Sequence, residues 1–260
     1  HYIYQSAVSD TIQLRGRIRL YGGFDGSESD LAQRHPAQRT ILDGRDSGLN
    51  NRVYHVLRGA SQTLIDGFDV REGLAIGAAA DERGAGLLLD SHDQVVVRNC
   101  HFVDNTAAAL AAAIAIQRSH ALIVQSRFVN NDTTLANSGA GAIAIDDNAS
   151  ATIGSSEFHG NQSQLVGGAL IVSGANSSLV VHRSQFAQNT ANSFSGAIHS
   201  EPNTQLLVSN SSFSRNQAEQ GGALYINSPH SATLENTEFD ANTGTFGGAI
   251  YAFGGPVALD

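Results

Sequence analysis

Two short motifs recur in register along this chain of 260 residues, and they constrain its fold more than any other feature. A chain built from units repeating every 20 to 50 residues stacks those units into a solenoid, a propeller or an array. A Gly-Ala-Ile or Gly-Gly-Ala-Leu signature occurs at 141–143, 167–170, 196–198, 221–224 and 247–250. The other motif, Phe-x-x-Asn, recurs about every 27 residues, at Phe102–Asn105, Phe128–Asn131, Phe158–Asn161, Phe186–Asn189, Phe213–Asn216 and Phe239–Asn242.

Apolar residues inside each repeat alternate with a period of two, which is typical of strands. Such pairs are Leu87 and Leu89, Ile114 and Ile116, Ile143 and Ile145, Leu170 and Val172, and Leu224 and Ile226. A second short apolar strand precedes each Phe, and Gly, Asn and Ser separate the strands. We therefore predict an all-β solenoid of parallel β coils, with about nine coils of about 27 residues.

An alanine-rich segment conflicts with this pattern. Residues 107–113 read Ala-Ala-Ala-Leu-Ala-Ala-Ala, which favours a helix. The repeat register instead assigns 113–116 to a strand. We expect the strand, with at most a helical turn before it.

Stacked columns of equivalent residues account for most of the conspicuous side chains. The Phe column is expected to fill the interior and the Asn column to form a ladder of amides at one corner. The Gly column allows a tight bend or a close backbone approach. The single cysteine, Cys100, falls in a column that is otherwise Ser or Thr, so we interpret it as a small buried thiol and not as a nucleophile.

Composition excludes several classes of function. The net charge is −9 and all 15 cations are Arg, so a nucleic-acid partner is not expected. No run of 18 apolar residues is present, so the chain is not expected to span a membrane as a helix. One cysteine excludes an intrachain disulfide and a Cys-rich zinc site. We expect no cofactor, no metal ion and no catalytic residue.

The alternating Gly-Gly-Ala-Ile and Phe-x-x-Asn motifs resemble those of the polymorphic outer-membrane proteins of the autotransporter type, and of related right-handed β-helix repeat proteins of bacterial surfaces. Further upstream, residues 20–28, Arg34 and 40–44 look like the opening segment common in large secreted β-helix proteins, and 65–70 resemble the coil that follows. The resemblance covers roughly 18–253.

This resemblance implies a right-handed parallel β-helix and a location outside the cell or on the bacterial surface. It also implies a signal peptide before this segment and an anchor after it, so we expect an excised passenger fragment. We expect one domain over 1–260, with N-terminal coils over 1–70 and repeat coils over 71–260. The function we predict is a non-enzymatic adhesin or recognition module that binds a host-cell protein or a glycan.

A polysaccharide lyase or glycoside hydrolase on the same scaffold is the alternative. Such enzymes need carboxylates gathered on one face, in some cases with Ca²⁺. In register, Asp90 and Asp146 lie two coils apart, about 10 Å on the strand spacing, with Asp93 and Asp147 nearby. We interpret them as solvated turn carboxylates.

One outward column changes character near the C-terminal end. In successive coils it reads Leu88, Ala115, Ala144, Ile171, His199, Tyr225 and Tyr251. The next outward position reads Glu201, Asn227 and Phe253 in the last three coils. Exposed aromatic rings beside polar side chains suit a sugar ring or a protein surface, so we predict that these six residues of the last three coils form a ligand-binding face.

Overall fold

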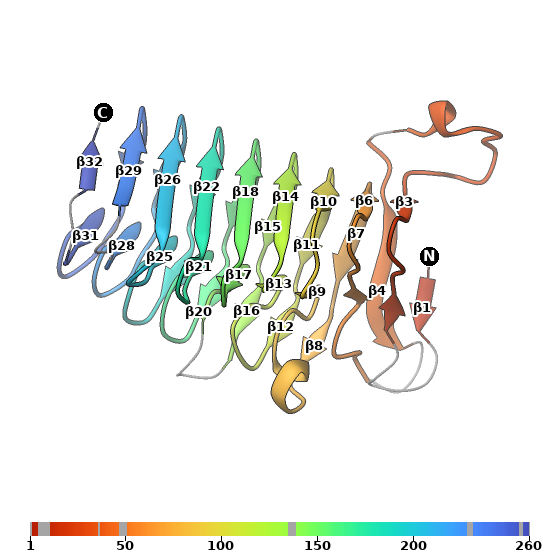
Figure 1. Cartoon of the computed structure of the whole chain (residues 1–260), viewed down its shortest axis with the longest axis horizontal. Coiled ribbons are helices and arrows are strands. Elements are labelled where there is room, and N and C mark those ends of the chain that lie inside the picture. Colours follow the sequence, from red (N-terminus) through yellow and green to blue (C-terminus); the bar gives the residue numbers. More distant parts are fainter. Residues whose placement is uncertain are drawn as a thin grey trace.

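The computed structural model describes residues 2–4, 11–35, 37–46, 51–134, 139–227, 231–254 and 257–259. Short strands stack coil upon coil along one axis, with the N-terminal coils at one end and β31 and β32 at the other (Figure 1). Within the described residues, strands in neighbouring coils pair in parallel and form three nine-stranded sheets and one five-stranded sheet.

Each coil runs through sheet B, sheet C and sheet A, and the middle coils add a strand of a short fourth sheet. Sheet B contains β2 (Ile12–Gln13), β5 (Leu57–Arg58), β9 (Leu87–Asp90), β13 (Ile114–Gln117), β17 (Ile143–Asp146), β21 (Leu170–Val172), β25 (Ile198–Ser200), β28 (Leu224–Ile226) and β31 (Ile250–Ala252). Sheet C contains β3 (Arg19–Tyr21), β6 (Leu64–Asp66), β10 (Val95–Arg98), β14 (His120–Val124), β18 (Ser150–Gly154), β22 (Ser178–His182), β26 (Gln205–Ser209), β29 (Ser231–Glu235) and β32 (Val257–Leu259). Sheet A contains β1 (Tyr2–Tyr4), β4 (Thr40–Asp46), β7 (Phe68–Arg71), β11 (His101–Val103), β15 (Arg127–Val129), β19 (Glu157–His159), β23 (Gln185–Ala187), β27 (Ser212–Ser214) and β30 (Glu238–Asp240). The short sheet contains β8 (Leu74–Ala75), β12 (Thr106–Ala107), β16 (Asp132–Thr133), β20 (Gln162–Ser163) and β24 (Thr190–Ala191).

The predicted all-β parallel solenoid is confirmed, whereas the coil count differs slightly. About seven turns are regular, not nine. The first coils lack both motifs, and the segment between β3 and β4 projects from the stack (Figure 1). At the other end, β31 and β32 form only part of a coil. In the described residues the helical elements are two 3₁₀ turns, η1 (Leu31–Gln33) and η2 (Ala79–Glu82), and no helix is long and apolar enough to cross a membrane.

The Phe column forms a continuous stack inside the coils, as predicted. Centroids of successive rings are 4.6–5.2 Å apart and their planes differ by no more than 12°. From Phe102 to Phe213 these rings are fully or almost fully buried. Burial of large rings in contact with one another is the main source of cohesion between coils.

The Asn column forms the predicted ladder of amides, and it satisfies buried backbone groups as well. The Asn161 Nδ2 group donates to the Oδ1 atom of Asn189 at 2.9 Å and to the carbonyl of Phe128 at 2.9 Å. The Asn161 backbone N–H also donates to the Oδ1 atom of Asn189, at 3.0 Å. The same pattern links Asn131 to Asn161 and Asn189 to Asn216. A register shift between coils would leave these buried groups unpaired.

The Ser column and Cys100 have the structural role that was predicted. The hydroxyls of Ser126, Ser156, Ser184 and Ser211 each accept from the backbone N–H of the equivalent residue in the preceding coil, at 3.1–3.2 Å. Cys100 is fully buried, and its thiol donates to backbone carbonyls. Burial raises the pKa of this thiol to about 12, which keeps it protonated and unreactive.

The Gly column bends the chain where side chains would clash, also as predicted. Gly167, Gly221 and Gly247 have φ of 60–66°. A Cβ atom on Gly221 would lie 2.1 Å from the carbonyl oxygen of Leu224. Ser195 takes the same conformation at the equivalent position, with φ of 60°. The bend is therefore a property of the coil and glycine is its least strained occupant.

The alanine-rich segment forms no helix in the structure. The predicted strand is present and begins at Ile114, one residue later than predicted, and the helical turn that we allowed before it does not form. Ala111 instead forms a parallel bridge with Ala140, and Ala111, Ala112 and Ala113 are fully buried. Small side chains let this segment pack closely against its own coil, so tertiary packing overrides helix propensity.

A second apolar layer lies on the outer face of sheet B. Segments that precede the Gly column cover this face, and the two surfaces form a cluster of buried residues that includes Ala111, Ala140, Val166, Leu88, Ala115, Ala144 and Ile171. The outward column from Leu88 to Ile171 therefore faces away from the interior of the coil, but the covering layer buries it. Sheet B is covered over its middle coils.

Replacing Phe186 with Ala tests the ring stack. Phe186 is fully buried between Phe158 at 4.6 Å and Phe213 at 4.7 Å, so the substitution should reduce the free energy of unfolding by about 3–5 kcal/mol. The measurement is urea denaturation followed by circular dichroism. Leu122→Ala is the control, because Leu122 is 40% exposed on the outer face of sheet C and should change stability by less than about 1 kcal/mol. Equal losses in the two variants would contradict the inward assignment.

Candidate functional site

Three stacked rings mark the C-terminal end of the outer face of sheet B. Parallel register places His199 of β25 beside Tyr225 of β28, and Tyr225 beside Tyr251 of β31. The His199 and Tyr225 rings are 4.9 Å apart with an interplanar angle of 8°, and the Tyr225 and Tyr251 rings are 5.4 Å apart at 12°. The predicted ladder is present, and we call these three residues the aromatic ladder.

A second line of residues runs beside the aromatic ladder, and sequence reasoning missed it. Parallel bridges join Val166 to Phe194, Phe194 to Gln220 and Gln220 to Phe246. The Phe194 ring meets Tyr225 edge-on, with centroids 4.8 Å apart, and lies 6.0 Å from His199. Each of these residues immediately precedes the left-handed position of its coil, so reading that column in the sequence would have found them.

The exposure of the six predicted residues is uneven. His199 is only 5% exposed, so the prediction of an exposed ring is wrong for this residue. Phe194 and the column residue Ile171 of the preceding coil lie against that part of the face. Tyr225, Tyr251, Glu201 and Asn227 are half-buried, whereas Phe253 is 61% exposed. The cover residue Phe246 is also exposed, at 53%, so the open part of the site lies in the last coils.

Polar groups border the aromatic ladder on one side. The Glu201 Oε1 atom lies 3.7 Å from the Nε2 atom of His199, and this contact lowers the pKa of Glu201 although burial opposes the shift. The Nδ1 atom of His199 is buried and has no hydrogen-bond partner among the described residues. Burial raises the pKa of Tyr225, which keeps its phenol protonated. The site thus presents the neutral phenol of Tyr225 beside one carboxylate.

The candidate catalytic carboxylates lie in the predicted columns but are engaged in contacts. Asp90 and Asp146 flank Gln117 in register, two coils apart. Arg118 forms ion pairs with both Asp90 and Asp147. Asp146 accepts a hydrogen bond of 2.9 Å from the Ser173 hydroxyl. Within the described residues, no group of three or more His, Cys, Asp or Glu side chains could hold a metal ion.

A cavity of about 350 Å³ opens at the N-terminal end of the outer face of sheet B, lined by Thr11, Gln13, Tyr54, His55, Arg58 and Asp81. Gln13 and Arg58 occupy the same column as Leu88, which the sequence could not show because the first coils lack the motifs. His55 is 1% exposed. Its Nδ1 atom lies 3.1 Å from the carbonyl oxygen of Gly84 and its Nε2 atom 3.1 Å from Oδ1 of Asp81.

One family model matches the C-terminal part of the chain, a little less than half of its length. The family model described as right handed beta helix region matches residues 131–257, which include the aromatic ladder. No curated protein and no solved structure matched the chain. The match and the sheet topology together identify the fold as a right-handed parallel β-helix. This fold occurs in both enzymes and non-enzymes, and the resemblance to autotransporter passengers stays a prediction.

Buried His55 should make stability depend on pH. Burial lowers the pKa of His55, although its hydrogen bonds to Gly84 and Asp81 oppose the shift. The unfolded state therefore binds the proton more tightly, and the stability contributed by neutral His55 is lost as the pH falls below about 6.5. The unfolding temperature should drop between pH 7.5 and pH 5, and this drop should be smaller in His55→Gln. An equal drop in both proteins would show that His55 is not responsible.

Proposed function

We propose that this chain is a non-enzymatic recognition module of the autotransporter-passenger type, secreted or displayed on a bacterial surface. Its ligand is a glycan, carried by a host cell or by another surface, that binds at the aromatic ladder. The observation that carries the proposal is the ring stack that continues from buried His199 to half-buried Tyr225 and Tyr251, at the C-terminal end of sheet B, where the covering residue Phe246 is exposed.

The geometry of the stack determines which atoms a ligand meets. Because the rings are nearly parallel and about one strand spacing apart, each Tyr225 face packs on a neighbouring ring. Ring edges and phenol hydroxyls are then the groups left for a ligand. No hydrogen bond among the described residues engages the hydroxyl of Tyr225 or Tyr251. A phenol hydroxyl donates and accepts, as a sugar hydroxyl does, so the two are complementary.

Residues around the aromatic ladder complete a mixed surface. Asn227 supplies an amide that can donate and accept, and Glu201 supplies acceptors. Exposed Phe246 and Phe253 supply apolar area in the same coils. Binding sites for small polar ligands combine apolar side chains with a few directed polar groups, and this surface has that composition.

A polysaccharide lyase or glycoside hydrolase is the second candidate function. General acid and base catalysis needs two carboxylates that face the substrate. Here the candidate carboxylates are engaged within the protein: Asp90 and Asp147 form ion pairs with Arg118, and Asp146 accepts a hydrogen bond from Ser173. Screening the purified protein on pectins, alginate, glycosaminoglycans and xylans addresses this alternative. Turnover that Asp90→Asn or Asp146→Asn abolishes would contradict our proposal.

Paired tyrosine variants test the proposed site. Tyr225→Phe with Tyr251→Phe keeps the stack and removes only the hydroxyls, whereas Tyr225→Ala with Tyr251→Ala removes the rings. We expect the Phe pair to weaken binding on an array of purified glycans by about tenfold and the Ala pair to abolish it.

The matched control is Thr233→Ala on the outer face of sheet C, which should bind like the wild type. All variants should retain the wild-type circular dichroism spectrum. Binding that survives the Ala pair, with the fold intact, would exclude the aromatic ladder as the binding surface.

A further inference from the structure

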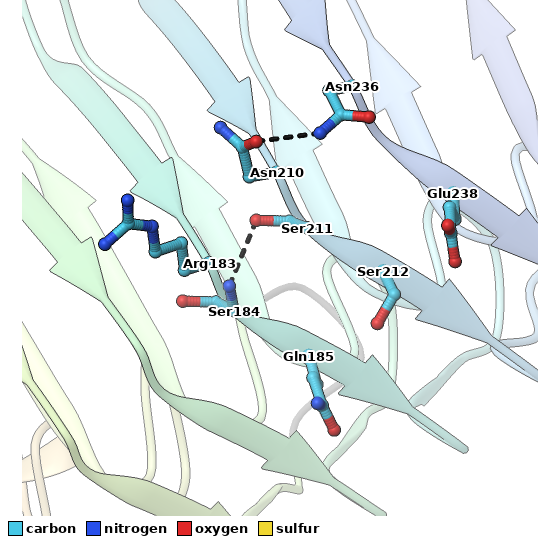
Figure 2. Close-up of a pocket in the computed structure, with 8 residues that line it drawn as sticks. All are labelled: Arg183, Ser184, Gln185, Asn210, Ser211, Ser212, Asn236 and Glu238. Carbon is cyan, nitrogen blue, oxygen red and sulfur yellow. Dashed lines mark hydrogen bonds between the residues drawn. The ribbon is translucent and has the colours of Figure 1, made fainter.

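A polar groove lies on another part of the molecule, at the corner where sheet C turns into sheet A (Figure 2). Its volume is about 290 Å³ and three successive coils form it. Arg183, Asn210 and Asn236 follow one another along the corner, and Gln185, Ser212 and Glu238 lie on the adjoining strands β23, β27 and β30 (Figure 2). We call these six residues the corner groove. It shares no residue with the aromatic ladder.

The backbone fixes the three corner residues in one conformation. Arg183, Asn210 and Asn236 have φ of 48°, 48° and 44°, and they are followed directly by buried Ser184, buried Ser211 and half-buried Thr237, respectively. Parallel register repeats the position at one strand spacing, so the first and third coils are about 10 Å apart. Side chains of the corner groove are therefore mounted on a rigid, evenly spaced frame.

In the strand column, the equivalent positions of the two preceding coils are closed by a contact between side chains. Arg127 and Glu157, which precede Gln185 in the same column, form an ion pair of 2.9 Å with each other. In the corner groove the Asn236 Nδ2 group donates to the Oδ1 atom of Asn210 at 2.8 Å. No hydrogen bond or ion pair within the described part of the chain engages the side chains of Arg183, Gln185 or Glu238. Their donors and acceptors are open to a ligand.

The chemistry of these groups selects the class of ligand. A guanidinium, three amides, a hydroxyl and a carboxylate supply both donors and acceptors. Arg183 and Glu238 balance in formal charge, so a polyanion with many phosphates lacks the cations that it needs. No large apolar or aromatic side chain lines the corner groove, and protein interfaces depend on such residues. A ligand with many hydroxyl groups, each of which can both donate and accept, fits the corner groove best.

We infer that the corner groove is a second carbohydrate-binding site, which takes a neutral oligosaccharide lying along the solenoid axis across three coils. The inference rests on polar side chains that have no partner within the described part of the chain and that repeat from coil to coil at one strand spacing. It does not depend on the aromatic ladder. The groups that line this site are polar and open to water. Each hydrogen bond to a ligand therefore replaces a hydrogen bond to water and contributes little net free energy, so the affinity of this site alone should be modest.

Titration calorimetry with defined hexasaccharides tests the inference. The probes are the neutral hexamers of cellulose, xylan and chitin, with hexagalacturonate as the anionic comparison, added to the whole 260-residue chain. We expect at least one neutral hexamer to bind. Arg183→Gly and Asn210→Gly should each weaken that binding three- to tenfold, since glycine removes the side chain without straining a positive φ.

Two further variants make the outcome decisive. Gln125→Gly, at the same corner in an earlier coil, should leave the affinity unchanged. Because the aromatic ladder is itself proposed to bind glycans, each titration is repeated in a background that carries Tyr225→Ala with Tyr251→Ala. Binding that persists in this background is assigned to the corner groove, which separates this site from the proposed function. In that background, no binding of any neutral hexamer, or binding that survives Arg183→Gly combined with Asn210→Gly, would overturn the inference. Binding of hexagalacturonate alone would also overturn it, by showing an anion site.

Discussion

The buried amide ladder is the interaction on which the rest of this structure depends. From Asn131 to Asn242, each Oδ1 atom of the ladder accepts from a side-chain N–H and a backbone N–H of the Asn in the preceding coil, and each Nδ2 group also donates to a Phe carbonyl. Slippage of one coil by a single residue would turn every strand side chain to the wrong face and leave several buried polar groups unpaired. Ring stacking supplies much of the cohesion, but non-directional burial tolerates displacement. The directional hydrogen bonds of Asn131, Asn161, Asn189 and Asn216 fix the register between coils. This register is the reason why equivalent residues of successive repeats stack in one column.

A fixed register allows one column to carry different chemistry in different coils. The outer column of sheet B begins with Gln13 and Arg58 beside a polar cavity, continues as small and aliphatic residues under the covering layer, and ends as His199, Tyr225 and Tyr251. The strand column of the corner groove changes in the same way. In earlier coils its residues Arg127 and Glu157 form an ion pair with each other, whereas the side chain of Gln185 in the next coil lines the groove. None of these changes disturbs the Phe and Asn columns.

Sequence periodicity predicted the parts of the fold that repeat. The Phe stack, the amide ladder, the place of Cys100 and the pairing of Tyr225 with Tyr251 all follow from aligning equivalent residues. It could not predict the covering layer, since alternation tells which side of a strand a residue faces and not what lies against that side. The burial of His199 and the packing of 108–113 both depend on that layer. The cavity around His55 and the buried ion pairs of Asp66 with Arg34 and Arg98 escaped prediction because the first coils carry no motif to align.

Strand propensity explains an isolated tyrosine on a sheet, because aromatic residues favour strands wherever they are half-buried. It does not explain two columns changing together. As the sheet column changes from Ile171 to His199 and the tyrosines, the covering column changes from Val166 to Phe194, then Gln220 and Phe246, although the two lines come from different segments of each coil. The first change seals His199, and the second leaves Phe246 exposed beside Tyr251. Propensity acts on each strand residue separately and places no demand on the residue that covers it. The joint change of both lines in the same coils supports our proposal that a ligand contacts both.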